Sequence, residues 1–178
     1  MERHDIVNMM RELKLSGMRA AYDDVMRSGL QHKRGAAEIL GDLLKAEIIE
    51  KTARSIRYQM SAAKFPVMKT LVEFDFDTSP LNEELVRSLH GGAFLDQTRN
   101  AVFVGGTGTG KTHLATAIGA NTVNARHRVR FFSAVDLVNR LEAEHRDGKA
   151  GRMTDRLTRI DLLIIPSQAC QHALPGNG

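Results

Sequence analysis

Cysteine is nearly absent from this 178-residue chain, and the single thiol, Cys170, excludes both an internal disulfide and a cysteine-based metal site. Long apolar runs are also missing, because no stretch approaches the roughly 18 residues that a membrane-spanning helix requires. The charged start, Met1–Asp5, is not followed by the apolar core of a secretory signal. We therefore expect a cytoplasmic protein that does not contact a membrane.

Metal-ligand patterns are missing as well. The seven histidines are scattered without the short spacings that chelation requires, and we assign no metal site to them: His4, His32, His90, His113, His127, His145 and His172. Apolar residues make up 42% of the chain and charged residues 26%. This balance is typical of a globular protein with one substantial core and a small additional module.

Positive charge is concentrated in the N-terminal part of the chain. Residues 1–70 carry thirteen Lys and Arg against nine Asp and Glu, whereas residues 71–178 carry twelve of each kind. A basic module beside a neutral one suggests an acidic partner such as DNA, although a solvated helix surface can carry the same surplus. The candidate DNA contacts are Arg54, Arg57 and Lys64, which cluster near the end of the predicted helical module.

Helical periodicity occupies residues 5–28 and 36–63, where apolar residues recur every three or four positions. Ser16-Gly17 predicts a break between two helices, and Pro66 ends the pattern because it disfavours a helix at the preceding residue. We therefore divide the chain into a helical DNA-binding or interaction module (1–65), a connector (66–98), a nucleotide-binding domain (99–165) and a disordered tail (166–178).

Strands and helices alternate from residue 99 onward. Ala101–Val104, Arg128–Phe132 and Asp161–Ile165 are apolar runs of strand length, and helical patterns follow the first two. This alternation predicts an α/β fold, in which a parallel sheet flanked by helices follows the small N-terminal helical module.

The most informative motif follows the first expected strand. Gly105-Gly-Thr-Gly-Thr-Gly110-Lys111-Thr112 satisfies G-x-x-x-x-G-K-[ST], and a helical pattern begins directly after it. The glycines allow consecutive backbone N–H groups to surround an anion, and the helix directs its positive end at the same point. Lys111 would reach the β- and γ-phosphates and the Thr112 hydroxyl would bind Mg²⁺. The expected ligands of ATP are Gly105, Gly106, Thr107, Gly108, Thr109, Gly110, Lys111 and Thr112, whereas His113 is expected to be a local helix residue.

The carboxylates that a phosphate-loop ATPase needs after a neighbouring buried strand are missing. Pro166-Ser167 follow the strand at the position where Mg²⁺ coordination and water polarisation require acidic groups. Asp161 lies at the other end of that strand, roughly 16 Å away at strand rise, which is too far to substitute. We therefore find no intact catalytic residue and expect no efficient hydrolysis.

Four segments carry a resemblance to a known family. Glu12–Tyr22, Lys64–Phe76, Phe103–Ala115 and Val129–Leu137 together resemble the IstB-like transposition helper ATPases, AAA+ relatives of the DnaC helicase loaders. The order and spacing of the Phe-Pro and Phe-Asp-Phe connector and of the Gly-Lys-Thr-His loop make this combination far more specific than the loop alone. The resemblance covers residues 1 to about 165 and includes a partial AAA+ domain.

The resemblance implies an ATP-dependent, DNA-binding accessory protein that oligomerises on target DNA and cooperates with an insertion-sequence transposase. In the family, the strand matching Leu162–Ile165 continues into Asp-Glu, and a further strand lies between it and the strand before the loop. Because this chain departs from that pattern after Ile165, we expect a truncated or frameshifted copy, and we do not extend the family's self-association to it. Either the two strands pair directly or an apolar edge stays open, which favours marginal stability.

Two other functions stay open. The first is a DNA-binding or oligomerising remnant with an idle nucleotide site. The second is a different phosphate-loop enzyme, such as a small kinase. The residues after Ile165 offer no acceptor-binding or lid segment, which argues against the kinase. Nucleotide binding that depends on Lys111 separates the remnant from an ATP-binding accessory protein.

Overall fold

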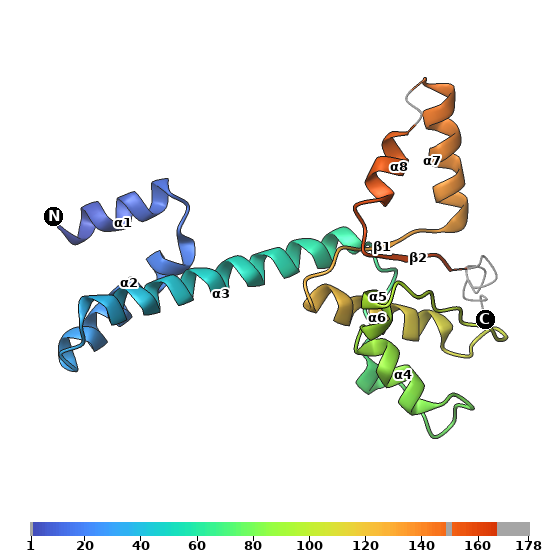
Figure 1. Ribbon diagram of the computed structural model, residues 1–178, viewed down its shortest axis with the longest axis horizontal. Coiled ribbons are helices and arrows are strands. Elements are labelled where there is room, and N and C mark those ends of the chain that lie inside the picture. Colours follow the sequence, from blue (N-terminus) through green and yellow to red (C-terminus); the bar gives the residue numbers. More distant parts are fainter. Residues whose placement is uncertain (1, 149–150, 167–178) are drawn as a thin grey trace, which may run out of the picture. The chain divides into compact units, whose positions relative to one another are not determined.

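A computed structural model of the chain describes residues 2–148 and 151–166 (Figure 1). The chain divides into two compact units, Met1–Arg57 and Tyr58–Gly178. Of the tail expected at residues 166–178, only Pro166 belongs to the described residues. In these residues, no helix is long and apolar enough to cross a bilayer.

Three helices build the first unit: α1 (Arg3–Glu12), α2 (Ser16–Gln31) and α3 (Ala36–Ala63), the last of which continues into the second unit. The predicted break at Ser16-Gly17 is confirmed, because α1 ends before it and α2 begins at it. The predicted helix over residues 36–63 is confirmed with the same bounds. The apolar stripes meet in a core whose buried members are Met10, Met18, Tyr22 and Leu43.

A buried carboxylate fixes the crossing of α2 and α3. Glu47 is only 4% exposed, and its Oε2 accepts the backbone N–H groups of Gly17 and Met18 at 2.7 and 3.0 Å. These two donors lie in the first turn of α2, where a helix has no internal acceptor for them, so Glu47 caps the helix from outside. Glycine is required at position 17, because a Cβ there would lie 2.4 Å from the carbonyl oxygen of Ala46.

The second unit is an α/β arrangement with a small sheet. Strands β1 (Val129–Phe131) and β2 (Leu162–Ile164) pair in parallel, with Val129 opposite Leu162 and Phe131 opposite Ile164. The other elements are η1 (Leu71–Glu73), α4 (Glu83–His90), α5 (Ala93–Asp96), α6 (Lys111–Asn124), α7 (Ala134–Arg146) and α8 (Arg152–Leu157). The predicted α/β class is confirmed, with more helix and less sheet than the sequence pattern indicates.

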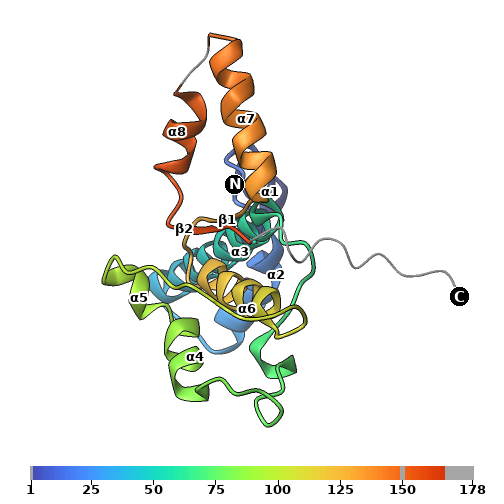
Figure 2. The same ribbon diagram turned by 90° about the vertical axis from the view of Figure 1, so that its right-hand side faces the viewer.

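Helix α6 forms the centre of the second unit, because Leu114 and Val123 on it are fully buried. Figure 2 shows α6 alongside the two strands, and the approach is close: a Cβ at Gly119 would lie 2.7 Å from Cδ1 of Ile164. Helices α7 and α8 lie side by side in both views, joined where the Met153 N–H donates to Glu144 at 2.8 Å.

The prediction of a strand at Ala101–Val104 is wrong. The structure assigns no strand there, and Val102 and Val104 are 83% and 90% exposed. An extended segment becomes a strand only when a neighbour accepts and donates its ladder hydrogen bonds. Within residues 2–148 and 151–166, the sheet contains β1 and β2 alone, and β2 pairs with β1 rather than with this segment. Of the two outcomes expected for the sheet, the structure shows the open edge.

Candidate functional site: the glycine-rich loop

The glycine-rich loop joins an extended segment to the start of α6, as the motif predicts. Gly108 and Gly110 have φ angles of 77° and 81°, in the left-handed region that strongly favours glycine. Gly110 is also the residue that caps the N-terminus of α6. The turn before the helix therefore depends on glycine at these two positions.

Free backbone donors line the loop. In the described part of the chain, no backbone N–H of residues 105–113 donates to a protein acceptor, and the next one, Leu114, donates to the Gly110 carbonyl at 2.9 Å. Unpaired N–H groups at the start of a 14-residue helix coincide with the positive end of its dipole. This combination favours an anion at the loop.

Lys111 begins α6, and its side chain bends back over the loop. Its Nζ donates to the Gly105 carbonyl at 2.8 Å and to Thr109 Oγ1 at 3.2 Å, and it also contacts the Gly106 carbonyl. All three partners are uncharged oxygens. Because a hydrogen bond from an ammonium to an anionic oxygen is stronger than one to a neutral oxygen, phosphate oxygens can replace these partners.

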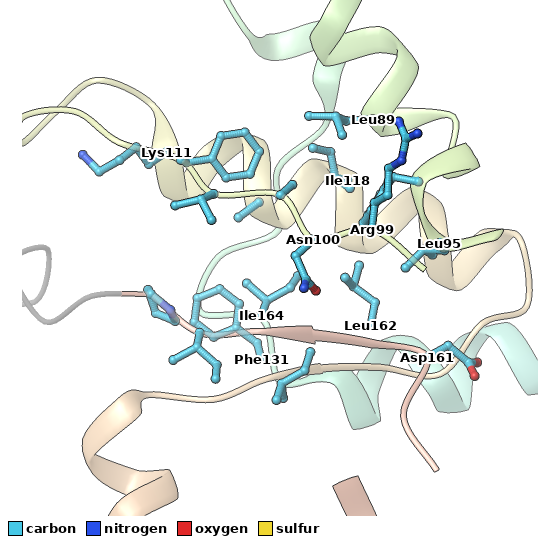
Figure 3. Close-up of a pocket in the computed structure, with 18 of the residues that line it drawn as sticks. Leu89, Leu95, Arg99, Asn100, Lys111, Ile118, Phe131, Asp161, Leu162 and Ile164 are labelled. Carbon is cyan, nitrogen blue, oxygen red and sulfur yellow. The ribbon is translucent and has the colours of Figure 1, made fainter. Parts of the chain in front are cut away.

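A cavity of about 690 Å³ lies beside the loop, with Lys111 and Thr112 on its lining (Figure 3). One wall is the segment Arg99–Phe103, and the opposite wall is β2 with its flanking residues. Figure 3 shows the Asn100 side chain pointing from the first wall toward β2. The cavity therefore lies where the sheet lacks a strand between the extended segment and β2.

The acidic group nearest the cavity has a structural partner. Asp161 precedes β2, and its Oδ2 accepts the backbone N–H of Arg128 at 2.7 Å and lies 3.7 Å from Nδ1 of His127. Figure 3 shows Asp161 at the opposite end of β2 from Lys111. Asp161 is the only acidic residue among the described residues that line the cavity, and Ser167 lies outside the described ranges. Among the described residues, the cavity lining therefore places no carboxylate at the end of β2 that faces Lys111.

The three basic residues expected to contact DNA are divided between the two units. Arg54 and Arg57 lie in the first unit, and both guanidinium groups approach Oε1 of Glu50, at 3.5 and 3.3 Å. Arg54 also donates to Oγ of Ser16. Lys64 follows the end of α3 and belongs to the second unit. Their role in DNA binding stays a prediction.

Two residues at the loop were not singled out by sequence reasoning as part of the site. The first, Phe74 from the connector, packs its ring against Gly110, and the second, Thr70, accepts a hydrogen bond from Nε2 of His113 at 2.8 Å. His113, expected to be a local helix residue, therefore also makes a long-range contact. The alternation of Phe74 and Phe76 around Asp75 is the signal that could have drawn attention to the connector.

The fold and the loop define a phosphate-loop α/β protein. Comparison with known proteins makes this specific, because the sequence matches the family described as "IstB-like ATP binding protein" over residues 8–172. The chain belongs to this family.

Individual relatives come from insertion sequences. The chain is 38% identical, over 75% of its length, to the protein named as the ATP-binding protein of insertion sequence IS5376 in Geobacillus stearothermophilus. It is 31% identical to the IS232 protein of Bacillus thuringiensis subsp. berliner, over 86% of its length, and 28% identical to the IS21 protein of Pseudomonas aeruginosa, over 91%. The chain spans 54% of the first relative's length and 62% of each of the other two.

Proposed function

We propose that this protein binds ATP through residues 105–112 and acts as an accessory protein in the transposition of an insertion sequence. The observation that carries the proposal is the loop itself, in which unpaired N–H groups, two left-handed glycines and a lysine without a carboxylate partner adjoin the start of α6. The names of its relatives, which refer to ATP binding and to insertion sequences, support the same conclusion.

Magnesium fits this site through Thr112. A threonine hydroxyl in the first turn of the helix is a hard oxygen ligand, which suits Mg²⁺, and Thr112 lies on the cavity lining beside Lys111. The ion would neutralise phosphate charge, while Lys111 and the loop N–H groups hold the β- and γ-phosphates. Because the described residues that line the cavity offer no carboxylate at this end of β2, we propose weak Mg²⁺-dependent binding without efficient hydrolysis.

Calorimetry with Mg·ATP tests the nucleotide site. Lys111→Ala removes the only charged side chain of the loop, and we expect its affinity to fall about ten- to a hundredfold, since a hydrogen bond to a charged group contributes about 1.5–3 kcal/mol. Lys45→Ala is the matched control, because this exposed lysine lies in α3, where it pairs with Asp42 at 3.4 Å. Equal affinity of wild type and Lys111→Ala for Mg·ATP would reject the site.

DNA binding is the second part of the proposal. The basic surplus before residue 70 and the presence of the relatives in mobile elements support salt-sensitive binding without strong sequence preference. Each phosphate contact that is lost flattens the slope of log affinity against log salt by about 0.9 for duplex DNA. We expect this flattening in Arg54→Ala/Arg57→Ala/Lys64→Ala and not in the control Arg146→Ala/Arg152→Ala/Arg156→Ala, which removes the same charge from α7 and α8. Equal slopes for the two triple variants would assign the basic surplus to a solvated surface.

The two measurements together separate the accessory protein from the remnant with an idle nucleotide site. DNA binding without Lys111-dependent ATP binding would favour the remnant. ATP binding that depends on Lys111 would favour the accessory protein, provided that Arg54→Ala/Arg57→Ala/Lys64→Ala also flattens the slope of log DNA affinity against log salt.

A further inference from the structure

The connector between α3 and α4 reaches the exact junction at which the loop becomes helix α6. A Cβ built on Gly110 would lie 2.5 Å from Cε2 of Phe74 and 3.2 Å from Cζ, so the phenyl ring fills the space that a side chain would otherwise occupy. Atoms of Phe74 are also the three nearest to this position. The ring therefore packs directly on the backbone of the last glycine of the loop.

The first turn of α6 is tied to the same connector. The His113 ring stands at 88° to the Phe74 ring with 5.3 Å between centroids, an edge-to-face arrangement that aromatic pairs prefer. Nε2 of His113 donates to the Thr70 carbonyl at 2.8 Å, which places the proton on Nε2. Two residues at the start of the helix, Gly110 and His113, are thus held by two residues of the connector.

The connector is itself anchored, so it can act as a fixed support. Leu71 is buried and packs in one apolar cluster with Val86, Leu114 and Ala117, and Phe74, Phe76 and Phe103 surround this cluster. One residue separates Phe103 from the start of the loop, and one residue separates the end of the loop from Leu114. The cluster therefore grips the chain immediately before and immediately after the phosphate loop.

We infer that Phe74 and His113 are positioning residues for nucleotide binding: they hold the Gly110–Lys111 junction in its binding geometry without contacting the nucleotide. This inference rests on the proposed function. Its physical basis is preorganisation, because a loop that is already ordered gives up less backbone freedom when the ligand binds. The consequence is that a change in the connector alters ATP affinity from outside the residues that touch the phosphates.

Two phenylalanines of the connector provide a matched pair for the test. Phe76 meets Phe74 edge-to-face at a centroid distance of 4.9 Å, packs against the same apolar cluster and lies beneath the guanidinium group of Arg87. Phe74→Ala and Phe76→Ala therefore remove the same side chain from the same cluster, but Phe74 is the ring whose atoms lie nearest to Gly110. We expect Phe74→Ala to weaken Mg·ATP binding about five- to thirtyfold, the equivalent of ordering one further backbone residue on binding, and Phe76→Ala to weaken it less than about twofold.

Amide hydrogen exchange gives a readout that does not involve nucleotide. The Leu114 N–H donates to the Gly110 carbonyl across the junction, so its exchange should accelerate in Phe74→Ala and stay near the wild-type rate in Phe76→Ala. A merely structural role of Phe74 would lower the thermal midpoint of both variants and leave Leu114 exchange and ATP affinity equal in the two.

A second pair of variants keeps the inference testable if Phe74→Ala fails to fold. His113→Gln retains an N–H donor for the Thr70 carbonyl, whereas His113→Leu loses it; we expect Gln to preserve affinity within about twofold and Leu to lower it about fivefold. If wild type binds ATP in a Lys111-dependent way and all four variants bind ATP as tightly as wild type, the inference is overturned and the proposed function stands. If wild type does not bind ATP, the proposed function fails. Unequal Leu114 exchange in the two phenylalanine variants still reports whether Phe74 holds the Gly110–Lys111 junction in place.

Discussion

The two units of this protein differ in how fully their polar backbone is paired. In the first unit, even the N–H groups at the start of α2 have an acceptor, the buried carboxylate of Glu47, and the core is closed by side chains of three successive helices. In the second unit, the sheet stops at two strands, and the extended segment before the loop exposes Val102 and Val104.

The reason for the difference is how far apart in the sequence the donors and acceptors of each unit's backbone hydrogen bonds lie. A helix satisfies its interior backbone groups within four residues, so α1 to α3 form from local sequence and need long-range contacts only at their ends and on one face. A strand satisfies none of its groups locally. The second unit therefore leaves donors and acceptors open wherever a neighbouring strand is not supplied, and its nucleotide loop lies beside one of these places.

The largest effect concerns ATP hydrolysis at this open side of the sheet. We expect no Lys111-dependent phosphate release from the chain, with or without DNA, and no rescue by Pro166→Asp/Ser167→Glu, because two carboxylates supply neither a strand for the open side of the sheet nor a transition-state arginine. A chimera that continues after Ile165 with the corresponding sequence of the IS5376 relative should gain DNA-stimulated turnover, since an arginine finger alone contributes about 10³–10⁵ in rate. Release of phosphate is measured for all three proteins at matched Mg²⁺ and DNA concentrations.

Turnover by the unaltered chain that disappears in Lys111→Ala would contradict this prediction. A fully active double variant would show instead that the open side of the sheet does not limit catalysis.

The next effect tests how tightly the first unit is packed. Gly17→Ala would drive a Cβ to 2.4 Å from a backbone oxygen of α3, so we expect the free energy of unfolding to fall by about 1–3 kcal/mol. Gly41→Ala is the control, because a Cβ there meets no atom within 4 Å and alanine favours a helix over glycine by about 1 kcal/mol. Urea unfolding should thus shift the two variants in opposite directions. Destabilisation by Gly41→Ala as large as by Gly17→Ala would show that the crossing of α2 and α3 is not the cause.

A third prediction tests the exposure of the segment before the loop. Val129 on β1 is 1% exposed, and replacing a methyl by a hydroxyl in Val129→Thr should lower the free energy of unfolding by about 1–2 kcal/mol because the new polar group is buried. Val102→Thr makes the same change at an exposed position, and we expect an effect within about 0.5 kcal/mol. Equal costs at both positions, measured by urea unfolding, would mean that residues 101–104 are buried in a sheet after all.

The smallest effect comes from the surface of the first unit. A hydrogen bond from Arg3, 2.5 Å away, together with its positive charge, lowers the pKa of Asp23 below its ordinary value of 3.8. A carboxyl whose pKa is lowered by folding stabilises the fold above its unfolded pKa, and that stabilisation is lost as the pH falls through the folded pKa. Arg3→Gln should therefore lower the thermal midpoint slightly at about pH 6 and by less at about pH 2, because protonation of Asp23 removes the charge that pairs with Arg3.

The control for this prediction is Arg27→Gln, which breaks the longer pair with Asp24 at 3.4 Å and should give a smaller change at either pH. An equal loss at both pH values would show that Arg3 acts through packing rather than through the charge of Asp23.

Sequence reasoning succeeded where the determining contacts are local. The bounds of α3, the break before α2, the presence of a helix at the end of the loop and the strand character of residues around Val129 and Leu162 all follow from periodicity, turn residues and the loop motif. The position of Asp161 at the far end of β2 also follows, since distance along a strand is proportional to residue count.

Sequence reasoning failed where a residue's role depends on a distant partner. Ala101–Val104 has the composition of a buried strand, yet no strand in the described residues lies beside it to pair with. Phe74 lies 36 positions before Gly110, so no local sequence pattern predicts that its ring packs on the loop. In the same way, the acceptor for the first turn of α2 comes from Glu47, 30 residues away from Gly17.

By itself, the sequence of this protein determined the helices, the α/β class and the glycine-lysine-threonine motif, because each depends on groups within a few residues of one another. Only the tertiary structure decided which side chains support the loop, which side chain caps the start of α2 and which side of the sheet stays open. The physical reason is that packing and strand pairing join residues that are close in space and far apart in the chain, so their energy is absent from any short window of sequence.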